Sequence, residues 1–142
     1  MAVQVSVFLQ DQPGRLEGIV KALSGAGINI RATAIASSEG FGVAKFLVDQ
    51  PGEAATALRD WGFSVSLKSV VAVVLDDKIG GLARVLPYIT EKGINVQDAY
   101  GFITAAGEEA IFVFEVEEPE ELEAHLREKD CHVLEAEVLY GL

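Results

Sequence analysis

The chain has 142 residues, half of them apolar, and 22 acidic against 11 basic side chains give it a formal net charge of −11. The apolar share predicts a folded protein with a core and excludes a disordered chain. The acidic balance argues against nucleic acid and anionic membrane surfaces as partners, because both attract clustered Lys and Arg.

The chain has no apolar run near the roughly 18 residues that predict a membrane span, and its first residues lack the pattern of a secretory signal. The only cysteine, Cys131, cannot form an internal disulfide, which favours the cytoplasm. The two histidines, His125 and His132, have no metal-ligand spacing, so we expect neither a metal nor another cofactor.

The first predicted elements are a half-buried strand over residues 2–10 and an amphipathic helix after a turn at 11–14. Strands are then expected over 28–36 and 41–48, a helix around Ala54, Leu58 and Trp61, and a strand over 63–69. Trp61 is expected to pack in the core from this helix.

The second half of the chain repeats the motifs and the predicted order of elements of the first half. The motif Asp11–Leu16 recurs as Asp77–Leu82, and Gly27–Ile30 recurs as Gly93–Val96, each 66 positions later. The second half carries Pro87 inside its first predicted helix, where a bend is expected. A repeat of this length suits a small domain and is too long for a solenoid unit.

We therefore predict two domains, residues 1–69 and 70–142, each with the order β-α-β-β-α-β. This order implies an α+β fold with two ferredoxin-like antiparallel sheets, each with both helices on one face. The halves meet without a Gly, Pro or Ser-rich spacer, so a fixed pair of domains is expected.

The stretch Val70–Leu75 is apolar on both faces, whereas helices cover only one face of such a sheet. We expect a second chain to cover the other face, which makes the protein a homodimer.

The repeated motif has the chemistry of an amino-acid site. Gly14, like Gly80, lets a backbone approach a ligand closely, and the helix that follows presents free N–H groups to a carboxylate. Asn29 and Asn95 can both donate and accept, and the Asp that opens each motif can accept from an ammonium group. An ordinary alternative stays open, in which Asp caps a helix, Gly makes a turn and Asn follows a helix-ending Gly.

The loop Asp11–Leu16, the Gly-Ile-Asn-Ile entry to the second strand and the element order together resemble the ACT domain, a small-molecule-sensing regulatory module. The resemblance covers nearly the whole chain, as a tandem pair without an attached enzyme. It implies that an amino acid binds between paired copies, against the loop of one copy and the second strand of the other.

Carried over by position, the resemblance implies one site formed by Asp11, Gln12, Gly14, Arg15 and Leu16 with Asn95 and Val96. It implies a second site formed by Asp77, Lys78, Gly80, Gly81 and Leu82 with Asn29 and Ile30. Copy two has Ile79 where the family pattern has proline, so equal affinity of the two sites is not expected.

The hypothesis that follows is a non-enzymatic, allosteric sensor that binds an amino acid and regulates a partner enzyme of amino-acid metabolism. One alternative is a regulatory subunit of a dedicated enzyme, such as the small subunit of acetolactate synthase. Another is a small ferredoxin-like hydrolase similar to acylphosphatase, for which Arg15 and Asn29 superficially fit. Copy two lacks that arginine, because Gly81 takes its place.

Overall fold

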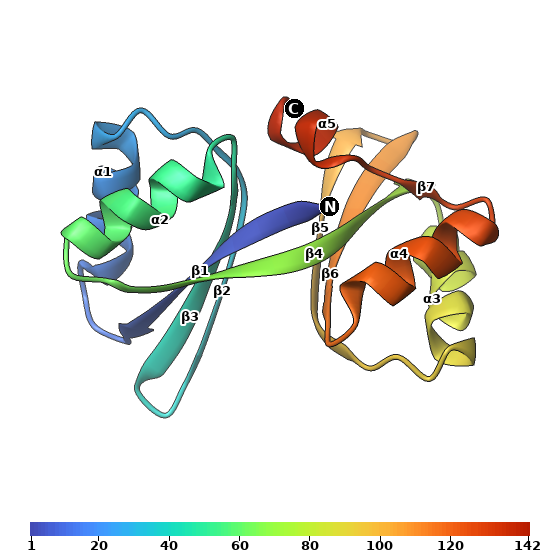
Figure 1. The fold of residues 1–142 in the computed structure, drawn as a ribbon, viewed down its shortest axis with the longest axis horizontal. Helices are drawn as coiled ribbons and strands as arrows, with labels where there is room; N and C mark the ends of the chain where they lie inside the picture. Colours follow the sequence, from blue (N-terminus) through green and yellow to red (C-terminus); the bar gives the residue numbers. More distant parts are fainter. The chain divides into compact units, whose positions relative to one another are not determined.

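The computed structural model describes all 142 residues, and the chain forms two compact units. The N-terminal unit consists of residues 3–68 and 140–142, and the C-terminal unit consists of residues 1–2 and 69–139. In each unit two helices cover one face of an antiparallel sheet (Figure 1). The predicted ferredoxin-like β-α-β-β-α-β fold is thus confirmed in both halves.

The N-terminal unit contains β1 (Ala2–Gln10), α1 (Arg15–Gly25), β2 (Ile30–Ser38), β3 (Phe41–Val48), α2 (Pro51–Asp60) and the start of β4 (Ser64–Asp76). Its strands follow the order β2-β3-β1-β4. The core lies between sheet and helices, with Val7 and Phe46 from the strands packed against Ile19 and Leu23 of α1 and Leu58 of α2. Alternate strand residues therefore face away from the helices.

The C-terminal unit continues β4 and adds α3 (Gly81–Glu91), β5 (Val96–Ala105), β6 (Glu109–Val116), α4 (Pro119–Glu128) and β7 (His132–Val133). Its strand order is β5-β6-β4-β7. Val73 and Phe114 of the sheet pack against Ile89 of α3 and Leu126 of α4. Leu58 and Leu126, which lie 68 positions apart, thus have the same place in their two cores.

Three features differ from the sequence-based expectation. Trp61 lies just past the end of α2 and is 67% exposed, so its expected core position is wrong. The chain's last helix, α5 (Ala136–Tyr140), has only five residues, too few for a periodic pattern to predict it. Finally, Val70 and Ala72 are already buried within this one chain, so this strand does not itself require a second chain to cover it.

Pro87 lies inside α3, and its side chain is exposed to solvent. This position agrees with the expectation that the helix tolerates a proline on its solvent side.

None of the five helices combines the length and apolar character needed to cross a membrane.

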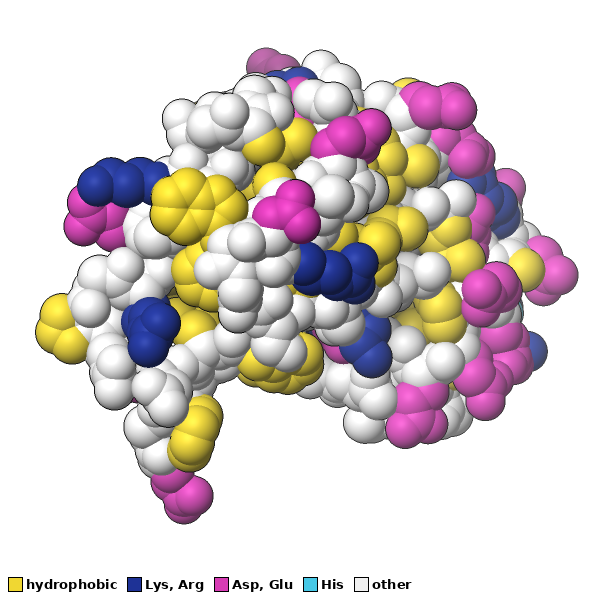
Figure 2. All heavy atoms as spheres, turned by 60° about the vertical axis from the view of Figure 1, so that its left-hand side comes forward, with side chains coloured by type: hydrophobic (Ala, Val, Ile, Leu, Met, Phe, Trp, Pro, Cys, Tyr) yellow, Lys and Arg dark blue, Asp and Glu magenta, His cyan; other side chains and the backbone are white.

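Charge divides unequally between the units. The N-terminal unit holds six acidic and six basic side chains, so the remaining 16 acidic and five basic ones place the whole net charge of −11 in the C-terminal unit. Acidic side chains accordingly crowd part of the surface in Figure 2. The two copies therefore share a fold while presenting different electrostatic surfaces.

Because Leu58 and Leu126 are fully buried, replacing either by Ala should lower the free energy of unfolding by about 2–5 kcal/mol, the cost of lost contacts and a residual cavity. Urea denaturation measures the change. The control is Leu67→Ala, because Leu67 is 41% exposed. Equal losses for the buried and the exposed leucines would contradict the two cores described here.

Candidate functional site

The two repeated loops have the same backbone geometry. Gly14 has φ 85° and Gly80 has φ 86°, a left-handed conformation that residues with a side chain rarely adopt, and each glycine immediately precedes its helix. In each unit the loop is fixed to the neighbouring hairpin, because Asp11 N donates to Gly40 O (2.8 Å) and Asp77 N donates to Glu108 O (3.1 Å). The motif therefore sets the direction in which each helix begins.

Both helices begin without a side-chain cap. Neither Asp11 nor Asp77 caps its helix, so that ordinary explanation of the repeated aspartate does not apply. In α1 the Arg15 N–H is bound by Gln12 O (3.3 Å), and in α3 the Gly81 N–H is bound by Lys78 O (3.0 Å). The next N–H groups of each helix remain available to an acceptor, at the positive end of the helix dipole.

The two aspartates have different surroundings. The Asp77 carboxylate accepts a hydrogen bond from the Gly107 N–H (2.7 Å) and so holds the turn between β5 and β6. Asp11 is exposed, and its carboxylate has no such bond. Of the two, Asp11 is the one whose acceptor atoms are free for an ammonium group.

Position 81 must be a glycine because of the nearby backbone oxygen of Asp76. The sequence alone instead suggests that a glycine stands here in order to leave space for a ligand. A Cβ atom at this position would lie well inside contact distance of Asp76 O, and Gly81 is buried. At the corresponding position Arg15 is exposed and donates from Nη2 to Gln12 Oε1 (3.4 Å). An arginine therefore cannot occupy this position in copy two.

The second part of each predicted site is the entry to the second strand. The Asn29 N–H donates to Asp49 Oδ1 (2.9 Å), and the Asp49 N–H donates to Asn29 O (3.1 Å), so this backbone is held while the residue stays exposed. Asn29 and Ile30 line a hollow of about 290 Å³ together with Val20 and Ser24 of α1. In copy two Asn95 is exposed and Val96 is half-buried.

Within one unit the loop and the strand entry lie at opposite ends of a helix. Residues 11–16 lead into α1 and Asn29 follows its end, and α1 has 11 residues, which span about 16 Å. The same separation holds along α3. The loop and strand entry of a single unit therefore cannot contact one small ligand.

The remaining predicted residues are less informative. Lys78 is exposed, Leu16 is 41% exposed, and Leu82 packs partly against the core of its unit. Ile79, which stands in place of the proline, is fully exposed.

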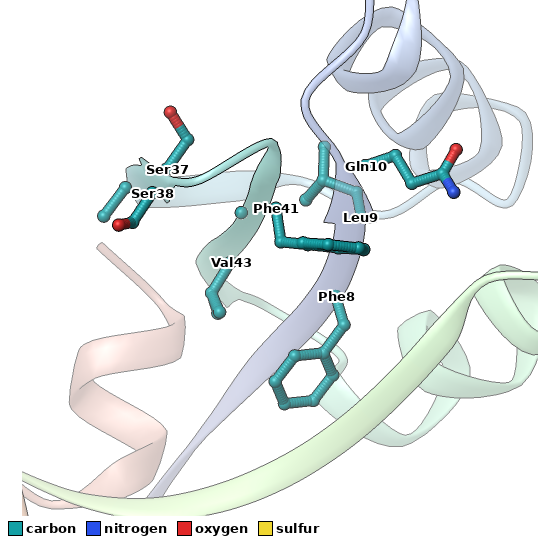
Figure 3. Close-up of a pocket in the computed structure, with 9 residues that line it drawn as sticks. Phe8, Leu9, Gln10, Ser37, Ser38, Phe41 and Val43 are labelled. Carbon is teal, nitrogen blue, oxygen red and sulfur yellow. The ribbon is translucent and has the colours of Figure 1, made fainter.

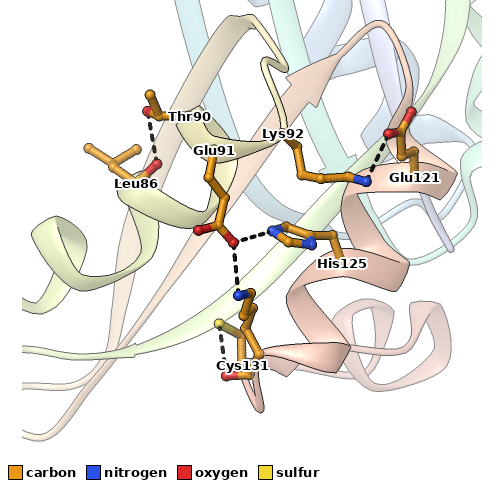
Figure 4. A network of polar contacts seen from close by, with 8 residues as sticks. Leu86, Thr90, Glu91, Lys92, Glu121, His125 and Cys131 are labelled. Carbon is orange, nitrogen blue, oxygen red and sulfur yellow. Dashed lines mark hydrogen bonds and ion pairs between the residues drawn. The ribbon is translucent and has the colours of Figure 1, made fainter.

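Outside these loops, a cluster of charged contacts joins α3 to α4 (Figure 4). Glu91 Oε1 lies 2.8 Å from His125 Nε2 and 3.0 Å from Lys129 Nζ. Lys129 also lies over the ring of Tyr88. The hydrogen bond and charge of Lys129, with a smaller contribution from His125, hold the pKa of Glu91 below its usual value. These contacts of Glu91 join α3 to α4 and its C-terminal residue. No group of three or more ligating side chains in the chain is placed to hold a metal ion.

The only cysteine, Cys131, lies beside the core of the C-terminal unit. Desolvation, with a smaller contribution from Asp130, raises the pKa of the Cys131 thiol, so this half-buried side chain has little thiolate character. It packs against the C-terminal core, as its expected role of filler requires.

The sequence-based reasoning overlooked a group of apolar residues on the N-terminal sheet. Phe8 and Phe41 are 49% and 65% exposed. The available signal was Phe8 itself, an aromatic residue among the polar positions of an alternating strand.

Comparisons with known proteins agree with this fold. Residues 1–141 match the family described as ACT domain pair. Protein BT0572 from Bacteroides thetaiotaomicron is 32% identical, with a TM-score of 0.92 over 99% of this chain and 96% of that one. The regulatory subunit of aspartate kinase from Thermus thermophilus is 18% identical, with a TM-score of 0.64 over 89% of this chain and 91% of that one. No curated protein matches the sequence.

The close approach at Gly81 makes a prediction. Gly81→Ala should destabilise the protein by about 1–3 kcal/mol, because overpacking forces the backbone apart. The control is Gly25→Ala at the end of α1, where a Cβ meets no atom within 4 Å, and no loss is expected there. Thermal and urea denaturation measure both; equal stability of the two variants would contradict the geometry of the loop.

The Glu91 cluster gives a second prediction. A carboxyl group whose pKa is lowered by folding stabilises the protein above its unfolded pKa, and this contribution is lost as pH falls through the folded pKa. Glu91→Gln should therefore destabilise the protein at pH 7, and the difference from the original protein should shrink as the pH falls below about 4.5. Urea denaturation across pH 3–7 measures it, with Glu53→Gln in α2 as the control. A difference that is constant with pH would rule out this origin.

Proposed function

The chain belongs to the family of ACT domain pairs, and from this premise we propose that it is a non-enzymatic regulator that binds a free amino acid. Binding alters the activity of a partner enzyme of amino-acid metabolism. The observation that carries the proposal is the repeated loop, in which a left-handed glycine leads into an uncapped helix in both units.

Each part of an amino acid has a matching group. The free N–H groups at the start of α1 suit the α-carboxylate, and the exposed carboxylate of Asp11 suits the ammonium group. The amides of Asn29 and Asn95 provide donors and acceptors at the strand entries. Because loop and strand entry are separated within one unit, a complete site takes its two parts from different copies of the domain.

The proposed functional halves are the domains 1–69 and 70–142. Their loops are not equivalent: Asp77 already holds the turn at Gly107, whereas Asp11 is exposed. We expect the site that includes the first loop to bind the amino acid more tightly than the site that includes the second.

Solved structures of similar fold support a regulatory role. They include the regulatory subunits of aspartate kinase from Thermus thermophilus and Thermus flavus, which at 18% and 15% identity share the fold alone. We propose that this chain acts in the cytoplasm as a homodimer and that its regulated enzyme is a separate protein. Co-purification with one dedicated catalytic subunit would instead favour the alternative of a fixed enzyme subunit.

A thermal-shift screen against the twenty amino acids, followed by calorimetry, tests the function. A ligand at a hundred times its Kd should add about 2.7 kcal/mol to the free energy of unfolding, a visible shift for a chain of this size. The absence of any stabilising amino acid at millimolar concentration would overturn the proposal.

The residue assignment has its own test once a ligand is found. Asn29→Ala combined with Asn95→Ala should abolish binding, and Asp11→Ala should weaken it about tenfold, which corresponds to about 1.4 kcal/mol. Glu53→Ala in α2 serves as the control, because Glu53 is an exposed carboxylate outside both predicted sites, and its loss should leave the affinity unchanged. Unchanged affinity in the double variant would exclude these sites.

A further inference from the structure

The N-terminal sheet has a hollow of about 480 Å³, formed by β1 and the hairpin of β2 and β3 (Figure 3). Val7 and Ala44 of these strands belong to the core under the helices, so their neighbours Phe8 and Val43 point to the opposite face. In Figure 3 the side chains of Phe8, Phe41 and Val43 lie near one another.

The strand register arranges the lining in rows. Phe8 pairs with Val43, which pairs with Ala36, and this gives an apolar row across three strands. The next row runs from Gln10 through Phe41 to Ser38. No charged side chain lines the hollow, and its polar side chains on the face of Phe8 and Phe41 are the Gln10 amide and the Ser38 hydroxyl.

The C-terminal unit lacks the equivalent surface. There the row that corresponds to Gln10 and Phe41 pairs Asp76 with Glu109, so two carboxylates replace an amide and a phenyl ring. Glu109 also accepts a hydrogen bond from Thr104 within its hairpin (2.9 Å). The hollow is therefore a property of the first copy's residues and does not follow from the fold alone.

The size of the hollow indicates whether it suits a protein or a small molecule. Nine residues line the hollow, whereas a stable protein interface takes about 20–30 residues a side. Its volume is within the range of about 300–1,000 Å³ that is typical of small-molecule sites. An apolar surface without a compensating charge also disfavours a ligand that carries a net charge or two separated charges.

We propose that this hollow binds a small, neutral aromatic molecule, at a site separate from the proposed amino-acid loops. The rings of Phe8 and Phe41 provide offset or edge-to-face contacts, and Gln10 or Ser38 bonds a single polar group of the ligand. The hollow adjoins the first loop, since the Gln12 N–H donates to Gln10 O (2.9 Å) and the Asp11 N–H donates to Gly40 O in the turn of the same hairpin. An occupant thus lies beside both anchors of the loop without needing the loop's own side chains.

The test is a titration of the full-length protein with indole, a neutral aromatic probe with one N–H donor, followed by two-dimensional amide NMR. Saturable shifts are expected for the amides of residues 8–10 and 36–43. Phe41→Glu places at this position the residue type found at Glu109 in the second copy, and it should weaken indole binding at least tenfold. Phe41→Ser should weaken binding equally, because it removes the ring without adding charge. The matched control is Ile103→Glu, because Ile103 is 61% exposed on the other hairpin and Phe41 is 65% exposed.

Several outcomes would overturn the proposal: no saturable shift, shifts confined to other residues, or equal losses in the Phe41 and Ile103 variants. Phenylalanine, which carries two charges, should bind the hollow at least tenfold more weakly than indole, and equal binding would refute the neutral class. Shifts of the same amides on dilution without indole would mean that a second copy of the chain occupies the surface. The hollow and the proposed amino-acid sites use different residues. Success or failure of the indole titration therefore says nothing about the outcome of the amino-acid screen.

Discussion

A single backbone constraint positions much of each unit. The chain must turn from a sheet strand into a helix that lies across the same sheet, and it does so through a left-handed glycine, Gly14 or Gly80. The bond from the preceding aspartate N–H to the neighbouring hairpin fixes this turn. Since glycine has no side chain to offer as a cap, the same solution leaves the N–H groups that follow Arg15 in α1 and Gly81 in α3 free. Structural necessity and ligand-binding capacity thus arise from one residue.

The two copies of this strand-to-helix turn differ in the contacts that their side chains make. In copy two the Asp77 carboxylate holds a turn, and the space beside Asp76 O admits only glycine at position 81. In copy one the corresponding positions are Asp11 and Arg15, both exposed. The first copy keeps more unengaged polar atoms, and the second uses its own for internal fixation. This distribution explains why one motif, repeated twice, does not imply two equal sites.

The sequence allowed the fold to be predicted because periodicity and a constant offset both depend on local residues. The Leu and Ile stripes, the alternation in β1 and the repeated Gly-Ile-Asn each specify an element without knowledge of its neighbours. The sequence predicts which residues form the two sites, and that assignment stays a prediction; the contacts that these residues make within their own unit could not be predicted. That Asp77 bonds Gly107, 30 residues away, depends on how a hairpin folds back, and no local pattern contains this information. Trp61 was misplaced for a related reason, since its helical spacing continued past the residue at which α2 ends.

The division of charge also affects how the protein meets other molecules. A field that originates in 16 acidic and five basic side chains of one unit attracts a basic surface toward that unit, while the neutral unit exerts no net long-range attraction. The Debye length is about 8 Å at physiological ionic strength, so this attraction acts mainly in the last stage of an encounter. A basic partner is therefore oriented toward the C-terminal unit before the two molecules touch. The two units have the same fold, but only the acidic one attracts such a partner.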